Sequence, residues 1–276
     1  MKTRKGFTII ELMIAMTFVA VLMLTVAFLV IRITAIYQKG LTTRSVNQVG
    51  RNLITEFNRA VEDSPVDDAL ENRDQYFVTV TDGGTQLQGA FCTGKYSFLW
   101  NTGTAINEGR RIRFKFRNMA ANTDVETDFR LLRFNDGTRS ICEQLRAQRG
   151  RVVLDFSALT GLVYQEVRQQ RPLELLSISG EVADYVDTQD AAESDLALYD
   201  FRVFPPTVNR VTGHVFYSAT FVLGTLRGID ITAAGNYCVN ISETLNTDFA
   251  YCSINKFNFA MTTMGTGGLQ DYYGQR

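Results

Sequence analysis

The chain has 276 residues, a formal net charge of −1 at pH 7, 45% hydrophobic residues and 11% aromatic residues. The near-neutral charge argues against a protein that binds polyanions over its whole surface, and the hydrophobic and aromatic content favours a folded domain. The chain has one histidine, so at most one imidazole is available for a catalytic site.

The first feature along the chain is a long apolar segment. Residues 12–31 contain no charge, Gly or Pro, and their only polar side chains are those of Thr17 and Thr25. About 20 helical residues, at 1.5 Å each, span a hydrocarbon core of roughly 30 Å. The segment therefore predicts a membrane-spanning helix.

The flanks of this segment predict its orientation. Lys2, Arg4 and Lys5 crowd the short N-terminal side, and cytoplasmic flanks carry an excess of Lys and Arg. We therefore expect the bulk of the chain to lie outside the cytoplasm. An ordinary secretory signal fits poorly, because the apolar run exceeds the usual ~7–15 residues and no small-residue cleavage pattern clearly follows it.

Glu11 is the unusual residue of the N-terminal region, because a carboxylate in a bilayer costs a few kcal/mol. A glutamate at headgroup level is one interpretation of it. The stretch Gly6-Phe7-Thr8-Ile9-Ile10-Glu11, however, resembles the processing site of type IV prepilins and pseudopilins. The resemblance rests on a short basic leader, Gly at the cut, Phe next, Glu fifth after the cut and a long apolar helix, and it covers roughly residues 1–60.

The resemblance implies roles for three residues. Gly6 would be the last leader residue, Phe7 the new N-terminus that prepilin peptidase exposes and methylates, and Glu11 the acid that sets subunit register. A free amine on Phe7 and a carboxylate on Glu11 are each costly in lipid, and pairing them between adjacent subunits offsets both penalties.

The helix is expected to continue to about residue 62, because the first proline is Pro65. Apolar residues recur every three or four positions, at Val46, Val49, Leu53, Phe57 and Ala60. This spacing places one apolar stripe on one face of an amphipathic second half. We expect the stripe to pack on the chain's own domain.

Beyond the helix the apolar period changes to two, which is typical of strands. We predict strands at 76–81, 95–100, 111–117, 128–135, 151–156, 173–178, 198–204, 215–223 and 256–261, and a short helix is an alternative at 159–167. The stretch 128–135, followed by Asp136-Gly137, suits the next arm of a hairpin. Residues 66–75 and 181–200 are expected to be loops, and the Gly-rich residues 265–276 a mobile tail.

Two charged stretches are candidate binding surfaces. Arg111, Arg113, Lys115 and Arg117 alternate with apolar residues, so they form a basic row that could meet phosphates or an acidic neighbour. The solvated outer face of a sheet is the simpler interpretation, and we prefer it to nucleic-acid binding. The second stretch carries oxygen ligands suited to Ca²⁺, at Asp184, Asp187, Asp190, Glu193 and Asp195. It lacks the EF-hand spacing and central Gly, so we prefer a solvated loop.

The four cysteines of an exported domain predict two disulfides with three possible connectivities. Many pilins close a loop near the C-terminus with a disulfide, so the resemblance favours Cys238 with Cys252, leaving Cys92 with Cys142. The alternative, four free thiols in a reducing compartment, conflicts with the expected topology.

Enzymatic motifs are not found in the sequence. His214 lies at the start of a strand pattern and is interpreted as a surface or packing residue. There is no nucleophile elbow, His-Glu-x-x-His or Walker-type loop, and the cysteine spacings are unlike those of zinc sites. We therefore predict no enzyme, no cofactor and no metal site.

These patterns predict an α+β fold with a long N-terminal helix packed on an antiparallel β-sheet with disulfide-fastened loops. We expect a leader peptide at 1–6, a transmembrane half-helix at 7–31, an amphipathic half-helix at 32–62 and an extracytoplasmic β-rich domain at 63–276.

The resemblance implies a structural subunit of a type IV pilus or related filament. The precursor would sit in the cytoplasmic membrane, be cut by prepilin peptidase and assemble with other pilin subunits at the cell surface. A domain of about 210 residues is larger than that of a typical major pilin, which favours a minor pilin. The alternatives are a pseudopilin of a type II secretion system and a single-pass membrane-anchored binding domain.

Overall fold

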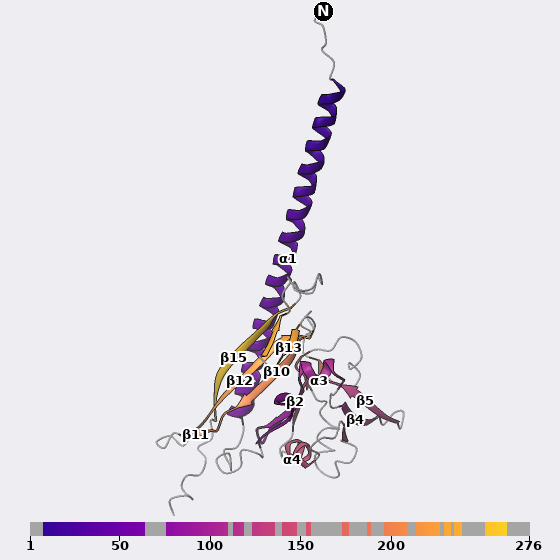
Figure 1. Ribbon diagram of the computed structural model, residues 1–276. Helices are drawn as coiled ribbons and strands as arrows, with labels where there is room; N and C mark the ends of the chain where they lie inside the picture. Colours follow the sequence, from indigo (N-terminus) through magenta and orange to yellow (C-terminus); the bar gives the residue numbers. More distant parts are fainter. Residues whose placement is uncertain are drawn as a thin grey trace, which may run out of the picture.

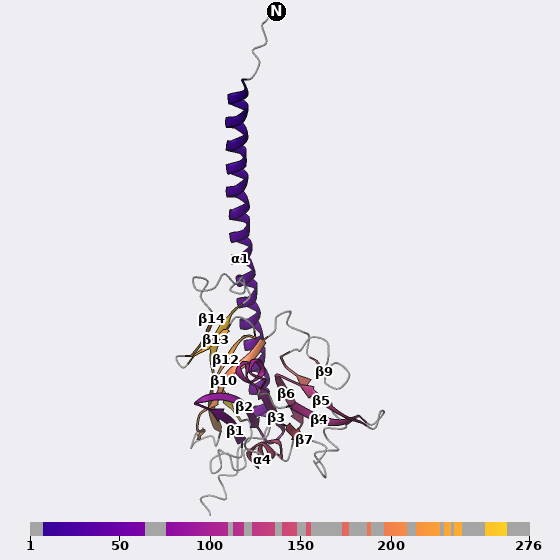
Figure 2. The ribbon, with the colours of Figure 1, turned by 45° about the vertical axis from the view of Figure 1, so that its right-hand side comes forward.

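A computed structural model describes residues 8–63, 76–109, 113–118, 123–135, 140–147, 153–155, 173–176, 187–188, 196–208, 214–226, 229–232, 235–238 and 252–263. For the strands within 113–128, 153–155, 187–188 and 229–238 it describes the backbone alone. A long helix stands on a group of β-sheets, and its N-terminal half projects away from them (Figures 1 and 2). The fold is α+β and pilin-like, as predicted.

The helix α1 runs from Ile9 to Glu62. Thr8 precedes it in an extended conformation and forms a capping box with Glu11, which satisfies backbone N–H groups that have no partner inside the helix. At the other end the backbone N–H of Asp63 donates to Arg59 O. Pro65 follows two positions later in the sequence, and proline disfavours the helical conformation for the residue before it.

The second half of α1 is docked on the sheets. Its buried residues are Val46, Gly50, Leu53, Phe57, Ala60 and Val61, and Val49 packs against the same core. The predicted apolar stripe is thereby confirmed, and it packs on the chain's own domain.

The larger sheet has six strands in the order β1-β2-β3-β6-β8-β9. These are Phe77–Asp82, Thr85–Cys92, Tyr96–Asn101, Leu131–Asn135, Leu173–Glu174 and Asp187–Thr188. Neighbours from β1 to β8 are antiparallel, and β9 pairs with β8 in parallel.

The second sheet lies against α1 (Figure 1) and is centred on β12, Val215–Thr225. Antiparallel to β12 run β10 (Leu196–Val203) and β11 (Thr207–Val208), interrupted by Pro205-Pro206, and on the other side β15 (Ile254–Thr262). On β12, buried and more exposed residues alternate from Val215 to Leu223. One face of this sheet therefore packs inward and the other faces solvent.

Smaller elements complete the described chain. The strands β4 (Arg113–Asn118), β5 (Thr123–Asp128) and β7 (Val153–Asp155) form one small sheet, and β13 (Ile229–Thr232) pairs with β14 (Gly235–Cys238) in another. Two short helices, α3 (Gly103–Asn107) and α4 (Ser140–Ala147), pack on the six-stranded sheet.

Phe57 of α1 lies at the centre of the core. Its ring centroid is 4.7 Å from that of Phe98 and 5.0 Å from that of Phe201, which belong to different sheets. Aromatic pairs at these separations contribute about 0.5–1.5 kcal/mol each beyond the area they bury. Phe57 thus contacts both main sheets.

Several predicted strands are confirmed with small shifts, at 76–81, 95–100, 151–156, 198–204, 215–223 and 256–261. The stretch 128–135 is wrong as one strand, because Phe129 and Arg130 separate β5 from β6. β5 pairs with β4 and β6 pairs with β3, so the two halves enter different sheets. Of the predicted strand at 173–178, the structure describes 173–176, and within these Leu173–Glu174 is a strand. The alternative helix at 159–167 lies outside the described residues.

The predicted loop at 181–200 is wrong at its C-terminal end. Leu196, Ala197, Leu198 and Tyr199 are buried in β10, because the acidic residues stop at Asp195 and an apolar run begins. The prediction also omitted β2, α3 and α4.

Candidate assembly interface

The residues of the processing motif lie at the free end of α1. Gly6 and Phe7 are outside the described residues, so their predicted roles remain predictions. The described chain starts at Thr8, at the tip farthest from the sheets (Figure 1).

Thr8 and Glu11 form a closed local hydrogen-bond pattern. The backbone N–H of Thr8 donates to Glu11 Oε2 over 3.0 Å, and the Thr8 hydroxyl donates to the same oxygen over 2.9 Å. The N–H of Glu11 donates in return to Thr8 Oγ1 over 3.4 Å. The carboxylate is therefore held at the start of the helix, while its other oxygen, Oε1, makes no hydrogen bond with the described residues. The sequence analysis missed Thr8, although Ser or Thr three residues before Glu is a recognisable capping signal.

The apolar first half of α1 is exposed. Its large side chains are accessible throughout, from Ile9 at 81% to Leu41 at 48%. The helix is long and apolar enough to cross a membrane, and its apolar stretch is not buried inside the molecule. Exposure of this much apolar surface to water is unfavourable by about 25 cal/mol per Å², so the segment requires lipid or other helices around it.

Polar contacts fix the second half of α1 to the sheets. Glu56 forms an ion pair with Arg133 of β6. Near the start of β15, Asn255 Nδ2 donates to Asn47 Oδ1 over 2.7 Å, and Ser253 Oγ donates to Thr43 Oγ1 over 3.3 Å. The exposed half-helix therefore continues a segment that is held in place along its length.

Gly50 permits the closest approach between α1 and β15. A Cβ placed there would lie 2.6 Å from two ring carbons of Phe257, whose ring stacks on Phe221 with centroids 5.0 Å apart. This contact requires glycine, because any side chain at position 50 would overlap the Phe257 ring.

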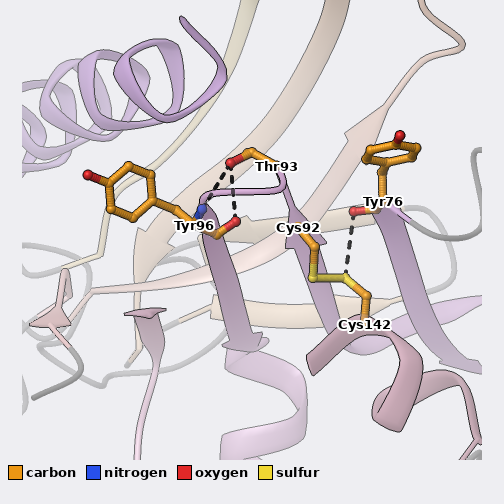
Figure 3. The surroundings of a disulfide bond; sticks show 5 residues. All are labelled: Tyr76, Cys92, Thr93, Tyr96 and Cys142. Carbon is orange, nitrogen blue, oxygen red and sulfur yellow. Dashed lines mark hydrogen bonds between the residues drawn. A yellow bond between two sulfur atoms is a disulfide. The ribbon is translucent and has the colours of Figure 1, made fainter. Parts of the chain in front are cut away.

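A disulfide joins Cys92, at the end of β2, to Cys142 in α4 (Figure 3). Beside it, Thr93 Oγ1 accepts from the backbone N–H of Tyr96 over 3.2 Å and stabilises the turn between β2 and β3. The predicted pairing of Cys92 with Cys142 is confirmed. Cys252 is also disulfide-bonded, but the side chain of Cys238 lies outside the described ones, so that pairing stays a prediction.

The predicted basic row falls on β4, except for Arg111, which lies outside the described residues. The backbone register places Arg113 opposite Asp128, Lys115 opposite Glu126 and Arg117 opposite Asp124. Residues directly opposite one another in an antiparallel pair share a face of the sheet. The acidic neighbour considered for this row is thus the next strand of the same sheet, which weakens the case for a phosphate-binding surface.

Glu174 is a buried carboxylate that the sequence analysis did not single out. Oε2 accepts from the N–H of Arg130 over 3.0 Å, and Oε1 accepts from the N–H groups of Leu131 and Leu176 over 2.9 and 3.0 Å. Burial raises the pKa of the Glu174 carboxyl to about 7, although these donors and the Arg130 guanidinium favour the ionised form.

Arg130 links Glu174 to the second sheet. The residue is 6% exposed, and its guanidinium donates to Leu196 O over 3.1 Å, at the start of β10. Glu174 and Arg130 together therefore connect β6, β8 and β10, and their role is structural.

The remaining candidate residues do not form a site in the described part of the chain. His214 Nδ1 lies 2.8 Å from Thr263 O, a contact between neighbouring strand ends. No group of three His, Cys, Asp or Glu side chains among the described residues could hold a metal ion. Asp187 is described only in its backbone, and the other predicted Ca²⁺ ligands lie outside the described residues.

Comparison with known proteins assigns the N-terminal region. Residues 1–27 match a family model described as the prokaryotic N-terminal methylation motif, the signal of type IV prepilins and pseudopilins. Neither the curated proteins nor the solved structures contain a match to the chain. The chain therefore carries the signal of a type IV pilin-like or pseudopilin precursor.

Proposed function

We propose that this chain is a minor pilin-like structural subunit of a type IV pilus or related filament. The observation that carries the proposal is the methylation motif at residues 1–27, joined to a helix with an exposed apolar first half and a docked second half. A subunit of this kind can exchange lipid for neighbouring helices around the same apolar surface.

In the proposal, prepilin peptidase removes residues 1–6 and methylates Phe7. The cytoplasmic membrane holds the precursor through residues 7–31, and the domain behind α1 lies outside the cytoplasm. The new amine of Phe7 then pairs with Glu11 of an adjacent subunit, and Glu11 Oε1 is the oxygen that its own helix cap leaves open.

The size of the domain supports a minor position in the filament over the repeating shaft. About 210 residues follow α1, and a domain of that size on every subunit would crowd the surface of a shaft. A type II secretion pseudopilin is the second candidate, since it shares the processing motif.

The proposal is tested by replacing Glu11 with Val in cells that make the filament. The variant should be cut, form its Cys92–Cys142 disulfide and stay in the membrane, because Glu11 is far from the sheets and a charge-free helix inserts more favourably by roughly 2–3 kcal/mol. It should be lost from the sheared filament fraction, measured by immunoblot against the membrane fraction.

Thr17→Val provides the matched control, because it also removes a polar group from the exposed apolar half but leaves the carboxylate in place. Normal filament incorporation of the Glu11 variant would contradict the proposed pairing.

A further inference from the structure

A polar face of α1 carries cations that the described residues do not pair. Between residues 32 and 55 the helix has four basic residues and no acidic one. Of these, Arg44 and Arg51 are exposed and form no ion pair or hydrogen bond through their side chains with the described residues. They lie seven residues apart, which puts them on the same side of the helix with about 10 Å between them along the axis.

A groove of about 530 Å³ runs along this face. Besides the two arginines, its described lining includes Asn47, Gln48 and Asn52 and contains no carboxylate. Guanidinium groups bind carboxylates through paired hydrogen bonds, and the neighbouring amides can donate to the same acceptor oxygens. The groove is thus suited to a surface that presents two or more carboxylates.

Three carboxylates of the described residues already have cationic partners of their own. Glu56 pairs with Arg133, Asp63 pairs with Lys95 at 3.0 Å, and Asp200 pairs with Arg202 at 2.8 Å. Among the described residues, the cations of the groove therefore have no carboxylate partner, while these acids have cationic partners.

Lipid headgroups do not fit as the occupant. Arg44 lies 13 residues beyond Ile31, the end of the apolar run, which is about 20 Å of helix. The headgroup region extends only about 5–8 Å beyond the hydrocarbon core on each side. The anionic surface must therefore come from a molecule outside the membrane.

We propose that the groove around Arg44 and Arg51 binds an acidic surface of a second copy of this chain. The sequence supplies the complementary charge, because residues 181–195 contain six carboxylates and no Lys or Arg. An interface that joins two different patches of the same chain is head-to-tail, and it generates a ring where the rotation closes and an open helical array where it does not. This inference rests on the proposed function and adds a second contact to the one at Glu11.

The test is capture of one tagged full-length copy by a second, differently tagged copy in detergent extracts at low salt. Arg44→Glu combined with Arg51→Glu should lower the co-captured amount about tenfold or more, and Arg51→Glu alone should lower it severalfold. Lys at both positions should retain most of the capture, because it keeps the charge. Arg146→Glu, the same charge reversal on exposed α4, is the matched control and should have no effect.

Undiminished capture of the double Glu variant would overturn the inference. Absence of capture between wild-type copies would overturn the second copy as occupant. So would a charge reversal that lowers capture of a different pilin subunit but does not lower capture of a second copy. If filament incorporation depends on Glu11 but capture between copies is unchanged by substitution of Arg44 and Arg51, this contact is rejected and the proposed function stands.

Discussion

Glu11 and Glu174 both lie where a carboxylate is costly, and their surroundings distinguish their roles. Three backbone N–H groups from two segments of the larger sheet surround Glu174, so its hydrogen-bonding needs are met inside the fold. Glu11 is at the exposed tip of α1, and only one of its oxygens is used by the helix cap. In the proposed function, its partner is the Phe7 amine of an adjacent subunit.

The stability of the domain should depend on pH through Glu174. Its pKa is raised from an ordinary value near 4.5 to about 7, so the folded state binds the proton more tightly than the unfolded state. This contribution is therefore complete below about pH 4.5 and is lost as the pH rises through 7, by about 3 kcal/mol. Thermal unfolding of the detergent-solubilised chain between pH 5 and pH 8 should show a falling Tm.

Glu174→Gln should flatten this pH dependence, because the amide does not titrate. It should also lower stability at pH 5 by about 1–3 kcal/mol, since its NH₂ group leaves a buried backbone N–H without an acceptor. An unchanged slope in the variant would mean that another group is responsible.

At the residue scale, sequence analysis could find Glu11 and the cysteines but not Glu174. Glu11 is recognisable by its position after Gly6 and before an uncharged run. Glu174 stands between Leu173 and Leu175, and no local pattern indicates that backbone donors from a segment 43 residues away will surround it.

At the element scale, α1 offers a direct comparison of two glycines. Gly50→Ala should destabilise the chain by about 1 kcal/mol, because the overlap with the Phe257 ring outweighs the gain in helix propensity. Gly40→Ala is the control, since nothing lies within 4 Å of its added Cβ. It should be neutral or stabilising by up to about 1 kcal/mol, and equal effects on the two Tm values would contradict close packing at Gly50.

The stabilisation that the disulfide between β2 and α4 provides should also be measurable from the Tm. Cys92 and Cys142 are separated by 50 positions, so loop closure contributes about 4 kcal/mol in the chain-entropy model. Replacing both by Ala should lower the Tm accordingly. Peptide mapping without reduction should show this linked pair and a second pair containing Cys252, whereas free thiols at these positions would contradict an exported domain.

The alternating strand β12 was predictable from the sequence, and the uniformly buried strand β2 was not. On β12 alternate side chains face the core and solvent, and the pattern was recognised. On β2 every residue from Gln86 to Cys92 is buried, and Gly89 lies against Trp100, so no period of two exists to be found. The choice of partner strand also could not be predicted, because it depends on contacts between residues far apart in the sequence. For example, β5 pairs with β4, whereas β6 pairs with β3.

At the scale of the whole molecule, the two halves of α1 have opposite surroundings. The second half is packed on two sheets around Phe57, and the first half is covered by nothing in the described part of the chain. A folded domain is thus attached to a helix that needs lipid or other helices. The polar face around Arg44 lies between these halves, where a neighbouring domain can reach it.

The N-terminus of the mature protein tests the central claim most directly. Mass spectrometry of the N-terminal peptide, from wild-type protein made with its prepilin peptidase, should show a chain that begins at methylated Phe7. Replacement of Gly6 by a bulky residue should leave the uncut precursor in the membrane. A wild-type chain that begins at Met1, or normal maturation of the Gly6 variant, would contradict the assignment as a pilin-like subunit.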